Sequence, residues 1–292
     1  MWAPTTKHAH QLRLPSFLVI GGMKCGSTTL YEDLLSQPGI RIPEKEVSPL
    51  VALGSSDADI RQQYAAMFDR ARSGRVWGDV STRYSMLPDL PGVADRARAV
   101  LGAELKIIYL VRDPLERLVS HHHHMHSLRG AGHMPADIDR CVREQPSLVN
   151  YSRYAMQLRP WREAFGEMAI RIVVFEEYVR NRPGTITDLC HFLGVEPRCD
   201  RVSVDVQYNR SVGKPVFNPF WERLSHHAIY RRGVRPWLSS EVRRCIMRRL
   251  LPAAPPRPAP PKPDTLDWLR EQLRPDVAEL EGFLGRSCGW AV

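Results

Sequence analysis

The hydrophobic positions of this chain fall into short continuous runs, each followed at once by glycine or polar residues. Four segments stand out, namely Phe17–Ile20, Val76–Val80, Leu105–Val111 and Ala169–Phe175; Leu105–Val111 is the clearest, and Val76–Val80, which contains Gly78 and Asp79, indicates only the end of a strand. Apolar runs of this length, bounded by turn residues, are typical of strands buried on both faces, as in a parallel sheet. A shorter strand and a loop are expected within residues 37–49, which prolines and a glycine interrupt.

Segments with apolar residues at helical spacing alternate with these strands. Helices are expected from Ser27 onward, from Pro114 onward, and over residues 57–72, 91–101, 134–145, 151–165, 184–193 and about 274–284. Strands that alternate with helices predict an α/β fold, in which a central, mostly parallel sheet is flanked by helices on both faces.

The length of the chain and its hydrophobic content bound its organisation. With 292 residues, of which 43% are hydrophobic, the chain is long enough to bury one α/β core. We expect one domain over residues 1–292, with its core at about 16–250. A stiff proline-rich connector at 252–263 then leads to the last helix.

The first strand leads into a turn that is suited to an anion. Gly21 and Gly22 end the strand, Lys24 follows, and Ser27 opens the helix. A helix N-terminus directs several backbone N–H groups and the positive end of the helix dipole toward one spot. Lys24 adds a full positive charge, so the stretch predicts a phosphate-type cradle. Its lysine precedes Gly26, which is not the order of a Walker A loop.

A second basic residue follows the third apolar run. Arg112 comes at the carboxyl end of the strand Leu105–Val111, where open α/β sheets bind ligands. Asp113 is suited to cap the next helix, and Pro114 to occupy its first position. Ser120 lies about two helical turns further on, so one oxyanion could be reached by both Arg112 and Ser120. A surface ion pair of Arg112 with Asp113 or another nearby carboxylate is the alternative.

Charge and cysteine usage narrow the range of functions. The net charge is +9, mostly from arginine, which suits bidentate binding of phosphate, sulfate and carboxylate. No DNA- or RNA-binding motif accompanies this charge, so nucleic acid is not expected as a partner. The six scattered cysteines lack metal-ligand spacing and are expected to be reduced. No apolar segment is long enough for a membrane span or a signal peptide, which predicts a soluble, cytoplasmic protein.

Together, the two basic motifs resemble those of a known enzyme family. Lys24-Cys-Gly-Ser-Thr28, and Arg112 followed eight residues later by Ser120, are similar to the two signatures of sulfotransferases that use 3′-phosphoadenosine 5′-phosphosulfate (PAPS). Further similar blocks lie at residues 78–84, 154–165, 175–178, 190–195 and 209–214. In the first of these blocks, Thr82 replaces the usual proline of the family pattern. The similarity covers about residues 16–220 and is closer to the bacterial and carbohydrate (heparan-sulfate-like) branch than to the cytosolic aryl branch.

The resemblance implies a P-loop-like three-layer fold and metal-free transfer of a sulfuryl group from PAPS, which leaves adenosine 3′,5′-bisphosphate (PAP). Lys24 would contact the bridging or 5′-phosphate oxygens and would serve as a catalytic residue. The other residues implied in donor binding are Cys25, Gly26, Ser27, Thr28 and Thr29 at the 5′-phosphosulfate, and Arg112, Ser120, Arg210 and Lys214 at the 3′-phosphate.

Sulfuryl transfer also needs a base for the proton of the attacking hydroxyl. The resemblance implies Glu46, because Lys45-Glu46 matches the start of a catalytic segment in the carbohydrate branch, although the aromatic pair that ends the segment is missing. A solvated loop charge is the alternative interpretation of Glu46. His124 or His123 is a second candidate base, and Asp79 is a third, although we expect Asp79 to be a buried hydrogen-bonding group.

A histidine-rich run follows Ser120. His122 and His126 have the i, i+4 spacing used in helical zinc sites, but no third ligand is indicated, so no metal site is expected. We expect this run to form a polar wall of the acceptor cleft instead. The remainder of that cleft is expected in residues 45–55, 81–88 and 210–235.

The expected acceptor is a small molecule or glycan, namely a hydroxyl of a glycan or of a glycosylated or phenolic natural product. Two other functions stay open. A small-molecule kinase with an unusual P-loop would require Mg²⁺ and ATP, but it gives no reason for the placement of Arg112 and Ser120. A non-catalytic binder of anionic glycans would exploit the net charge of +9, but it leaves Lys24 and Glu46 without roles.

Overall fold

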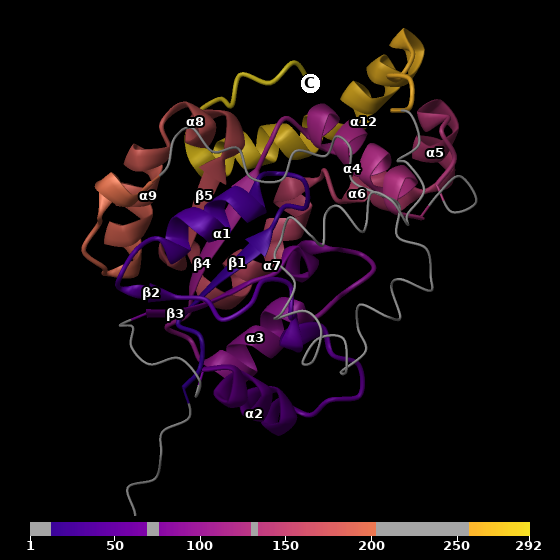
Figure 1. Cartoon of the computed structure of the whole chain (residues 1–292). Coiled ribbons are helices and arrows are strands. Elements are labelled where there is room, and N and C mark those ends of the chain that lie inside the picture. The colour runs from indigo at the N-terminus through magenta and orange to yellow at the C-terminus, as the bar shows by residue number, and fades with distance from the viewer. Residues whose placement is uncertain (1–12, 69–75, 130–133, 203–256) are drawn as a thin grey trace, which may run out of the picture. The chain divides into compact units, whose positions relative to one another are not determined.

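The computed structural model describes residues 13–68, 76–129, 134–202 and 257–292 (Figure 1). The chain divides into two compact units, each built from two stretches of sequence. Unit 1 consists of residues 1–112 and 154–207, and unit 2 of residues 113–153 and 208–292. The organisation of residues 1–292 as one domain therefore stays a prediction, and each unit is described by itself.

Unit 1 is built on a five-stranded sheet in the order β2-β3-β1-β4-β5. All of its neighbouring strands are parallel. The strands are β1 (Phe17–Gly21), β2 (Ile40–Arg41), β3 (Val76–Val80), β4 (Lys106–Val111) and β5 (Ile170–Val174). Every residue of β1 is buried, as expected for a strand with parallel neighbours on both sides.

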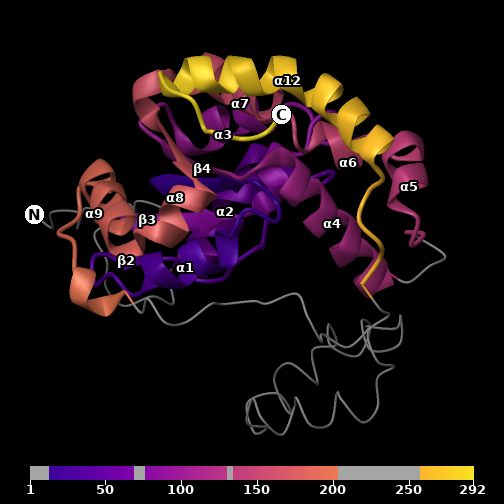
Figure 2. The ribbon, with the colours of Figure 1, turned by 90° about the horizontal axis from the view of Figure 1, so that it is seen from above.

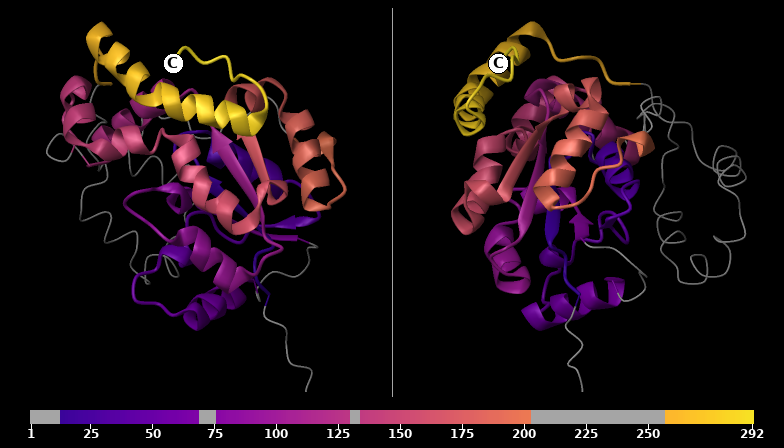
Figure 3. Two further views of the ribbon diagram at one scale, coloured as in Figure 1. Left: turned by 180° about the vertical axis from the view of Figure 1, so that it is seen from behind. Right: turned by 90° about the vertical axis from the view of Figure 1, so that its left-hand side faces the viewer.

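Helices cover both faces of this sheet, which confirms the α/β fold class. The helices of unit 1 are α1 (Ser27–Leu35), α2 (Asp57–Phe68), α3 (Val93–Leu101), α7 (Tyr154–Phe165), α8 (Phe175–Arg180) and α9 (Arg182–Leu193). Figure 2 shows α1 and α9 on one side of the strands and α3 and α7 on the other. In the left view of Figure 3, which is seen from behind, α7 lies in front of the sheet. The apolar face predicted for α7 is the buried one, since Tyr154, Leu158 and Trp161 are all buried.

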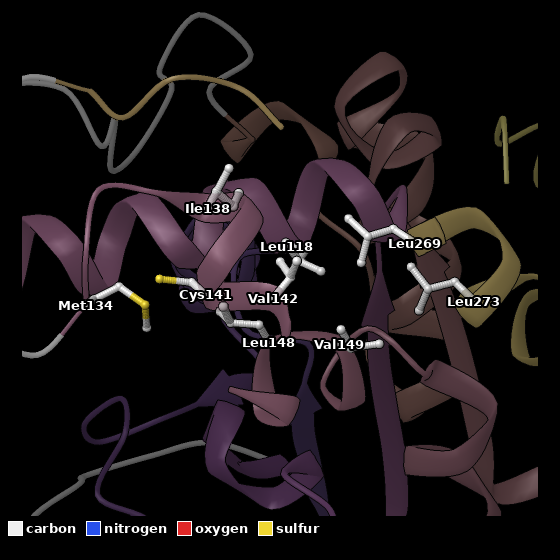
Figure 4. Packing of buried hydrophobic residues seen from close by; sticks show 9 residues of the cluster. All are labelled: Leu118, Met134, Ile138, Cys141, Val142, Leu148, Val149, Leu269 and Leu273. Carbon is white, nitrogen blue, oxygen red and sulfur yellow. The ribbon is translucent and has the colours of Figure 1, made fainter. Parts of the chain in front are cut away.

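Unit 2 is helical in its described part. Its helices are α4 (Pro114–Arg129), α5 (Ile138–Glu144), α6 (Pro146–Asn150) and α12 (Pro263–Leu284). Leu118 of α4 and Leu269 of α12 belong to one buried hydrophobic cluster with residues of α5 and α6 (Figure 4). Thus a helix near the C-terminus completes the core of a unit that begins at residue 113.

The last helix begins earlier than the sequence pattern predicted. We expected it at about residue 274, but α12 starts at Pro263, at the end of the proline-rich connector. A proline is tolerated in the first helical turn because the N–H that it lacks would have no intrahelical partner there. Leu269 and Leu273 of the added stretch are fully buried. Pro275 lies inside this helix.

Other boundaries differ by smaller amounts. The helix expected over 134–145 is shorter at its start, because α5 begins at Ile138, where Asp137 caps it by accepting from Arg140 N. A separate short helix, α6, was not predicted. No helix in the described part of the chain is long and apolar enough to cross a membrane. The cysteines of the described residues are all free.

Candidate functional site

The segments that follow four neighbouring strands of unit 1 lie along one edge of its sheet. Because β3, β1, β4 and β5 are parallel and adjacent, their carboxyl ends meet at the same edge. Ser81 follows β3, the turn containing Lys24 follows β1, Arg112 follows β4, and Phe175 follows β5. The hydrogen bond from Ser81 N to Val19 O, 3.0 Å long, joins two of these strand ends directly.

The turn after β1 leads into α1 with an open helix N-terminus. Gly26 takes the N-cap position in a left-handed conformation, with φ 91°. No described side chain caps this terminus, and the first turn carries no acidic residue. A helix N-terminus of this kind, with the positive end of its dipole, is suited to an anion, and the binding of one by residues Lys24 to Thr29 stays a prediction.

Phe175 contacts both this turn and Arg112. A Cβ atom on residue 26 would lie 2.7 Å from ring atoms of Phe175, so only glycine fits there. The guanidinium carbon of Arg112 stands 5.0 Å from the centroid of the same ring, within cation–π range. Arg112 also donates a long hydrogen bond, 3.5 Å, to the backbone carbonyl of Lys24. Unit 1 thus brings Arg112 next to the loop of Lys24, and the ring of Phe175 contacts both.

Tyr154 of α7 contacts both basic segments. Its hydroxyl is 3.6 Å from Sγ of Cys25 and accepts from the backbone N–H of Arg112 at 3.3 Å. Tyr154 and Cys25 are both fully buried. The side chain of Cys25 is therefore packed inside the protein.

Glu46 lies where the loop after β2 returns to the end of β3. Its backbone N–H donates to the carbonyl of Val80 at 2.8 Å. Its carboxylate accepts from Thr82 N (3.0 Å), Thr82 Oγ1 (3.1 Å), Ser81 Oγ (3.3 Å) and Lys45 Nζ (3.0 Å). The side chain nevertheless stays 35% exposed. The carboxylate of Glu46 is therefore oriented by the end of β3 and still accessible from solvent.

The backbone around these residues is unusual. Within the described ranges, Lys24 (φ 70°), Glu46 (φ 64°) and Ser48 (φ 57°) are the non-glycine residues with positive φ. Left-handed backbone is sparsely populated by such residues and costs of order 1 kcal/mol or more each. Two of the three are the residues predicted to carry the chemistry. Strain of this kind is concentrated at functional sites in proteins.

Asp79 is the buried hydrogen-bonding group that the sequence analysis expected. It is 1% exposed, and its Oδ2 accepts from the hydroxyls of Tyr64 (2.8 Å) and Tyr84. Its Oδ1 has no hydrogen-bond partner among the described residues. Burial raises the pKa of Asp79 to about 6, opposed by the two tyrosine hydroxyls, with the charge of Glu46 as a smaller raising contribution.

Two of the predicted site residues, Ser120 and His124, lie on α4 of unit 2, where both are half-buried. The helix starts as predicted: it begins at Pro114, and Oδ1 of Asp113 accepts from the N–H groups of Leu115 and Glu116, each at 2.9 Å. Because Arg112 belongs to unit 1 and Ser120 to unit 2, their joint binding of one phosphate stays a prediction.

Two other histidines of α4, His122 and His126, form hydrogen bonds within unit 2. A ring nitrogen of His122 hydrogen-bonds the carbonyl of Pro135 at 2.8 Å, and one of His126 the carbonyl of Met134 at 2.6 Å. The two rings are stacked, with centroids 6.4 Å apart. Burial lowers the pKa of His122. Within the described residues, no group of three or more acidic, histidine or cysteine side chains is arranged to hold a metal ion.

Two predicted residues, Arg210 and Lys214, lie outside the described residues, as does the whole of the expected acceptor segment 210–235. In turn, the structure adds Phe175, Tyr154, Ser81 and Thr82 to the site. Ser81 and Thr82 were expected only in the acceptor cleft, and the sequence patterns included Phe175 and Tyr154 without assigning them a role. The position of Phe175, Ser81 and Thr82 directly after a strand is the signal that could have identified these three.

Comparisons with known proteins identify the family whose domain model and fold this chain resembles. Residues 94–238 match the model of the sulfotransferase domain, which is just under half of the chain and includes Arg112 and Ser120. The match does not extend to the loop of Lys24 or to Glu46. A comparison with curated protein sequences found no match.

Solved structures similar to this chain are sulfotransferases. A sulfotransferase from Alicyclobacillus acidocaldarius superposes with a TM-score of 0.60 at 22% identity, covering 94% of this chain and 97% of that chain. Mouse sulfotransferase SULT7A1, complexed with PAP, has a TM-score of 0.52 at 16% identity over 91% of this chain and 84% of its own. The sulfotransferase domain from the curacin biosynthetic pathway also has a TM-score of 0.52, at 16% identity over 90% and 99%. The chain therefore has the fold of sulfotransferases, and residues 94–238 match their domain model.

Proposed function

We propose that this protein is a PAPS-dependent sulfotransferase that transfers a sulfuryl group to a hydroxyl of a glycan or of a glycosylated or phenolic natural product. The observation that carries the proposal is the arrangement at the carboxyl edge of the sheet. There, the N-terminus of α1 and Arg112 both lie against the ring of Phe175, and Arg112 donates to the carbonyl of Lys24. A nucleotide with phosphates at two separate positions needs two such anion-binding groups.

In this proposal the donor is held mainly through its phosphates. The N–H groups of residues 26–29 and the charge of Lys24 bind the 5′-phosphosulfate. Arg112 binds the 3′-phosphate, together with Ser120 and with Arg210 or Lys214. When the sulfuryl group leaves, negative charge grows on the bridging phosphate oxygen, and Lys24 stabilises that charge. The domain match over Arg112 and Ser120 supports this assignment.

Glu46 is proposed as the general base. Its carboxylate is accessible and ordered, whereas Asp79 is 1% exposed and cannot contact a substrate hydroxyl. His124 on α4 stays a second candidate. For the cellular location we keep the cytoplasm, supported by the free cysteines of the described residues.

Calorimetric titration with PAP and with ADP, in the absence of metal, tests the donor site. We expect PAP to bind much more tightly than ADP, because ADP lacks the 3′-phosphate. Arg112→Ala should weaken PAP binding by a factor of about 100 and leave ADP binding nearly unchanged. Equal binding of the two nucleotides, or binding only with Mg²⁺, would instead favour a kinase.

Arg171 offers a matched control for this variant. It is also an arginine of unit 1 that stands over a phenylalanine, 5.1 Å from the ring centroid of Phe192, but near the start of β5. Arg171→Ala should leave PAP binding unchanged.

The non-catalytic alternative is tested with Lys24→Ala. This variant should lose sulfuryl transfer while its binding to heparin, a bulk polyanion, changes little. Strong heparin binding without any release of PAP from PAPS by the wild-type protein would support the non-catalytic alternative.

A further inference from the structure

The carboxylate of Glu46 is held at two points by one residue. Thr82 donates its backbone N–H to Oε2 at 3.0 Å and its hydroxyl to Oε1 at 3.1 Å. One donor on each oxygen defines the plane of the carboxylate and prevents its rotation about the terminal bond, whereas a single donor would leave that rotation free. Thr82 itself is 8% exposed, so its two donors compete little with water.

A second layer fixes the hydroxyl next to Thr82. Ser81 donates to Oε2 of Glu46 at 3.3 Å, so its single proton is used there. Its oxygen accepts from the backbone N–H of Arg83 at 3.3 Å and lies 2.5 Å from the hydroxyl of Ser48, which is then the donor. Ser81 and Ser48 are buried. The hydrogen-bond directions assigned to Ser48 and Ser81 are thus consistent with each other.

The other donor to the carboxylate is of a different kind. Lys45 forms a solvent-accessible ion pair with Oε1, with side chains 20% and 35% exposed. Exposed pairs of this type contribute little to positioning, because water competes for both partners. The orientation of Glu46 therefore depends on the buried groups at the end of β3.

We propose that Thr82 is a positioning residue that presents the carboxylate of Glu46 to the acceptor hydroxyl. This inference rests on the proposed function. In the step it serves, the acceptor oxygen bonds to the sulfur of PAPS and gives its proton to Glu46. The bond from sulfur to the bridging phosphate oxygen breaks, and its electron pair stays on the PAP product. A base that is fixed in place shortens the search for this geometry.

The family pattern to which residues 78–84 are similar has proline where Thr82 stands. Proline has neither a backbone N–H nor a hydroxyl, so it could supply neither of the two donors. The substitution thus changes how the neighbouring carboxylate is held.

Steady-state kinetics of three variants test the proposal. Release of PAP from PAPS is measured with 4-nitrophenol and 4-nitrophenyl β-glucoside as acceptor probes, and with water alone. Thr82→Val keeps the shape and the backbone donor but removes the hydroxyl, so kcat should fall about tenfold, the effect of one hydrogen bond to a charged group, while KM for PAPS stays unchanged. Thr82→Ser should restore most of the rate. Thr185→Val is the matched control and should not change kcat. It removes a threonine hydroxyl of α9 that donates to the backbone carbonyl of Asn181.

A double-mutant cycle with Glu46→Gln separates positioning from a merely structural role. If Thr82 acts through the carboxylate, Thr82→Val should have little further effect on kcat in the Glu46→Gln background. A tenfold loss in both backgrounds, or an unchanged kcat in the single variant, would overturn the inference and leave the proposed function intact. Failure of the wild-type protein to release PAP with any of the probes, water included, would overturn both.

Discussion

Two buried aspartates of unit 1, Asp33 and Asp79, are similar in burial and different in their partners. They are 3% and 1% exposed. Asp33 on α1 receives two hydrogen bonds from the guanidinium of Arg182, at 3.0 and 2.6 Å, and one from Tyr178. Asp79 at the end of β3 accepts hydrogen bonds from two tyrosine hydroxyls, both on the same oxygen, and no cation among the described residues pairs with it.

The difference shows what a buried carboxylate needs. Arg182, which binds Asp33 with two hydrogen bonds, compensates the charge of Asp33 and joins α9 to α1, the helix that follows the proposed donor loop. The phenols around Asp79 stabilise the charged form only in part, so its pKa rises to about 6. The first aspartate is a structural connection, whereas the second is a group that titrates near neutral pH within the candidate site.

The largest expected effect comes from breaking the charged pair. Arg182→Met should lower the free energy of unfolding by about 3–5 kcal/mol, because Asp33 is left buried without a cation. Chemical denaturation measures the change. A loss below about 1 kcal/mol would show that water reaches Asp33 and that the contrast with Asp79 is overstated.

The next effect is a pH dependence from Asp79. The native protein keeps the proton of this carboxyl at pH values where the unfolded chain, with its ordinary pKa near 4, has lost it. Raising the pH from about 4 to about 6.5 should therefore lower the free energy of unfolding by about 2 kcal/mol through this group. Denaturation at several pH values should show this contribution in the wild type and not in Asp79→Asn. An identical pH dependence in both proteins would rule out the assignment.

Removing single phenols sharpens the comparison further. Tyr64→Phe deletes one of two donors to Asp79 and should cost about 1–2 kcal/mol. It should also raise the pKa of Asp79 further, since the Tyr64 hydroxyl favours the charged form. Tyr178→Phe should cost less, because Asp33 retains Arg182. The reverse order, measured by denaturation at pH 7, would contradict the view that the cation governs the stability of Asp33.

The smallest effect is expected for an ion pair in water. Arg140 and Glu144 form an i, i+4 pair on α5, with side chains 63% and 52% exposed. Solvent screens such a pair, so Arg140→Met should leave the melting temperature unchanged within measurement error. A clear loss of stability would show that ion-pair geometry, and not burial, separates this pair from that of Asp33 and Arg182.

Local signals in the sequence determined much of the fold. The mostly apolar segments located the strands β1, β3, β4 and β5, since apolar residues dominate a strand that has parallel neighbours. Asp113 and Pro114 located the start of α4, because capping involves residues only two or three apart. The glycine and lysine order after β1 predicted the open N-terminus of α1 for the same reason.

Only the tertiary structure decided which distant residues meet. The ring of Phe175 beside Gly26 and Arg112, the hold of Thr82 on Glu46, and the two tyrosines on Asp79 all depend on strand order and register. The early start of α12 at Pro263 likewise depends on burial of Leu269 and Leu273 against other helices of unit 2. Contacts of this kind join residues far apart in sequence, and their energies exceed the local preferences from which a pattern is predicted.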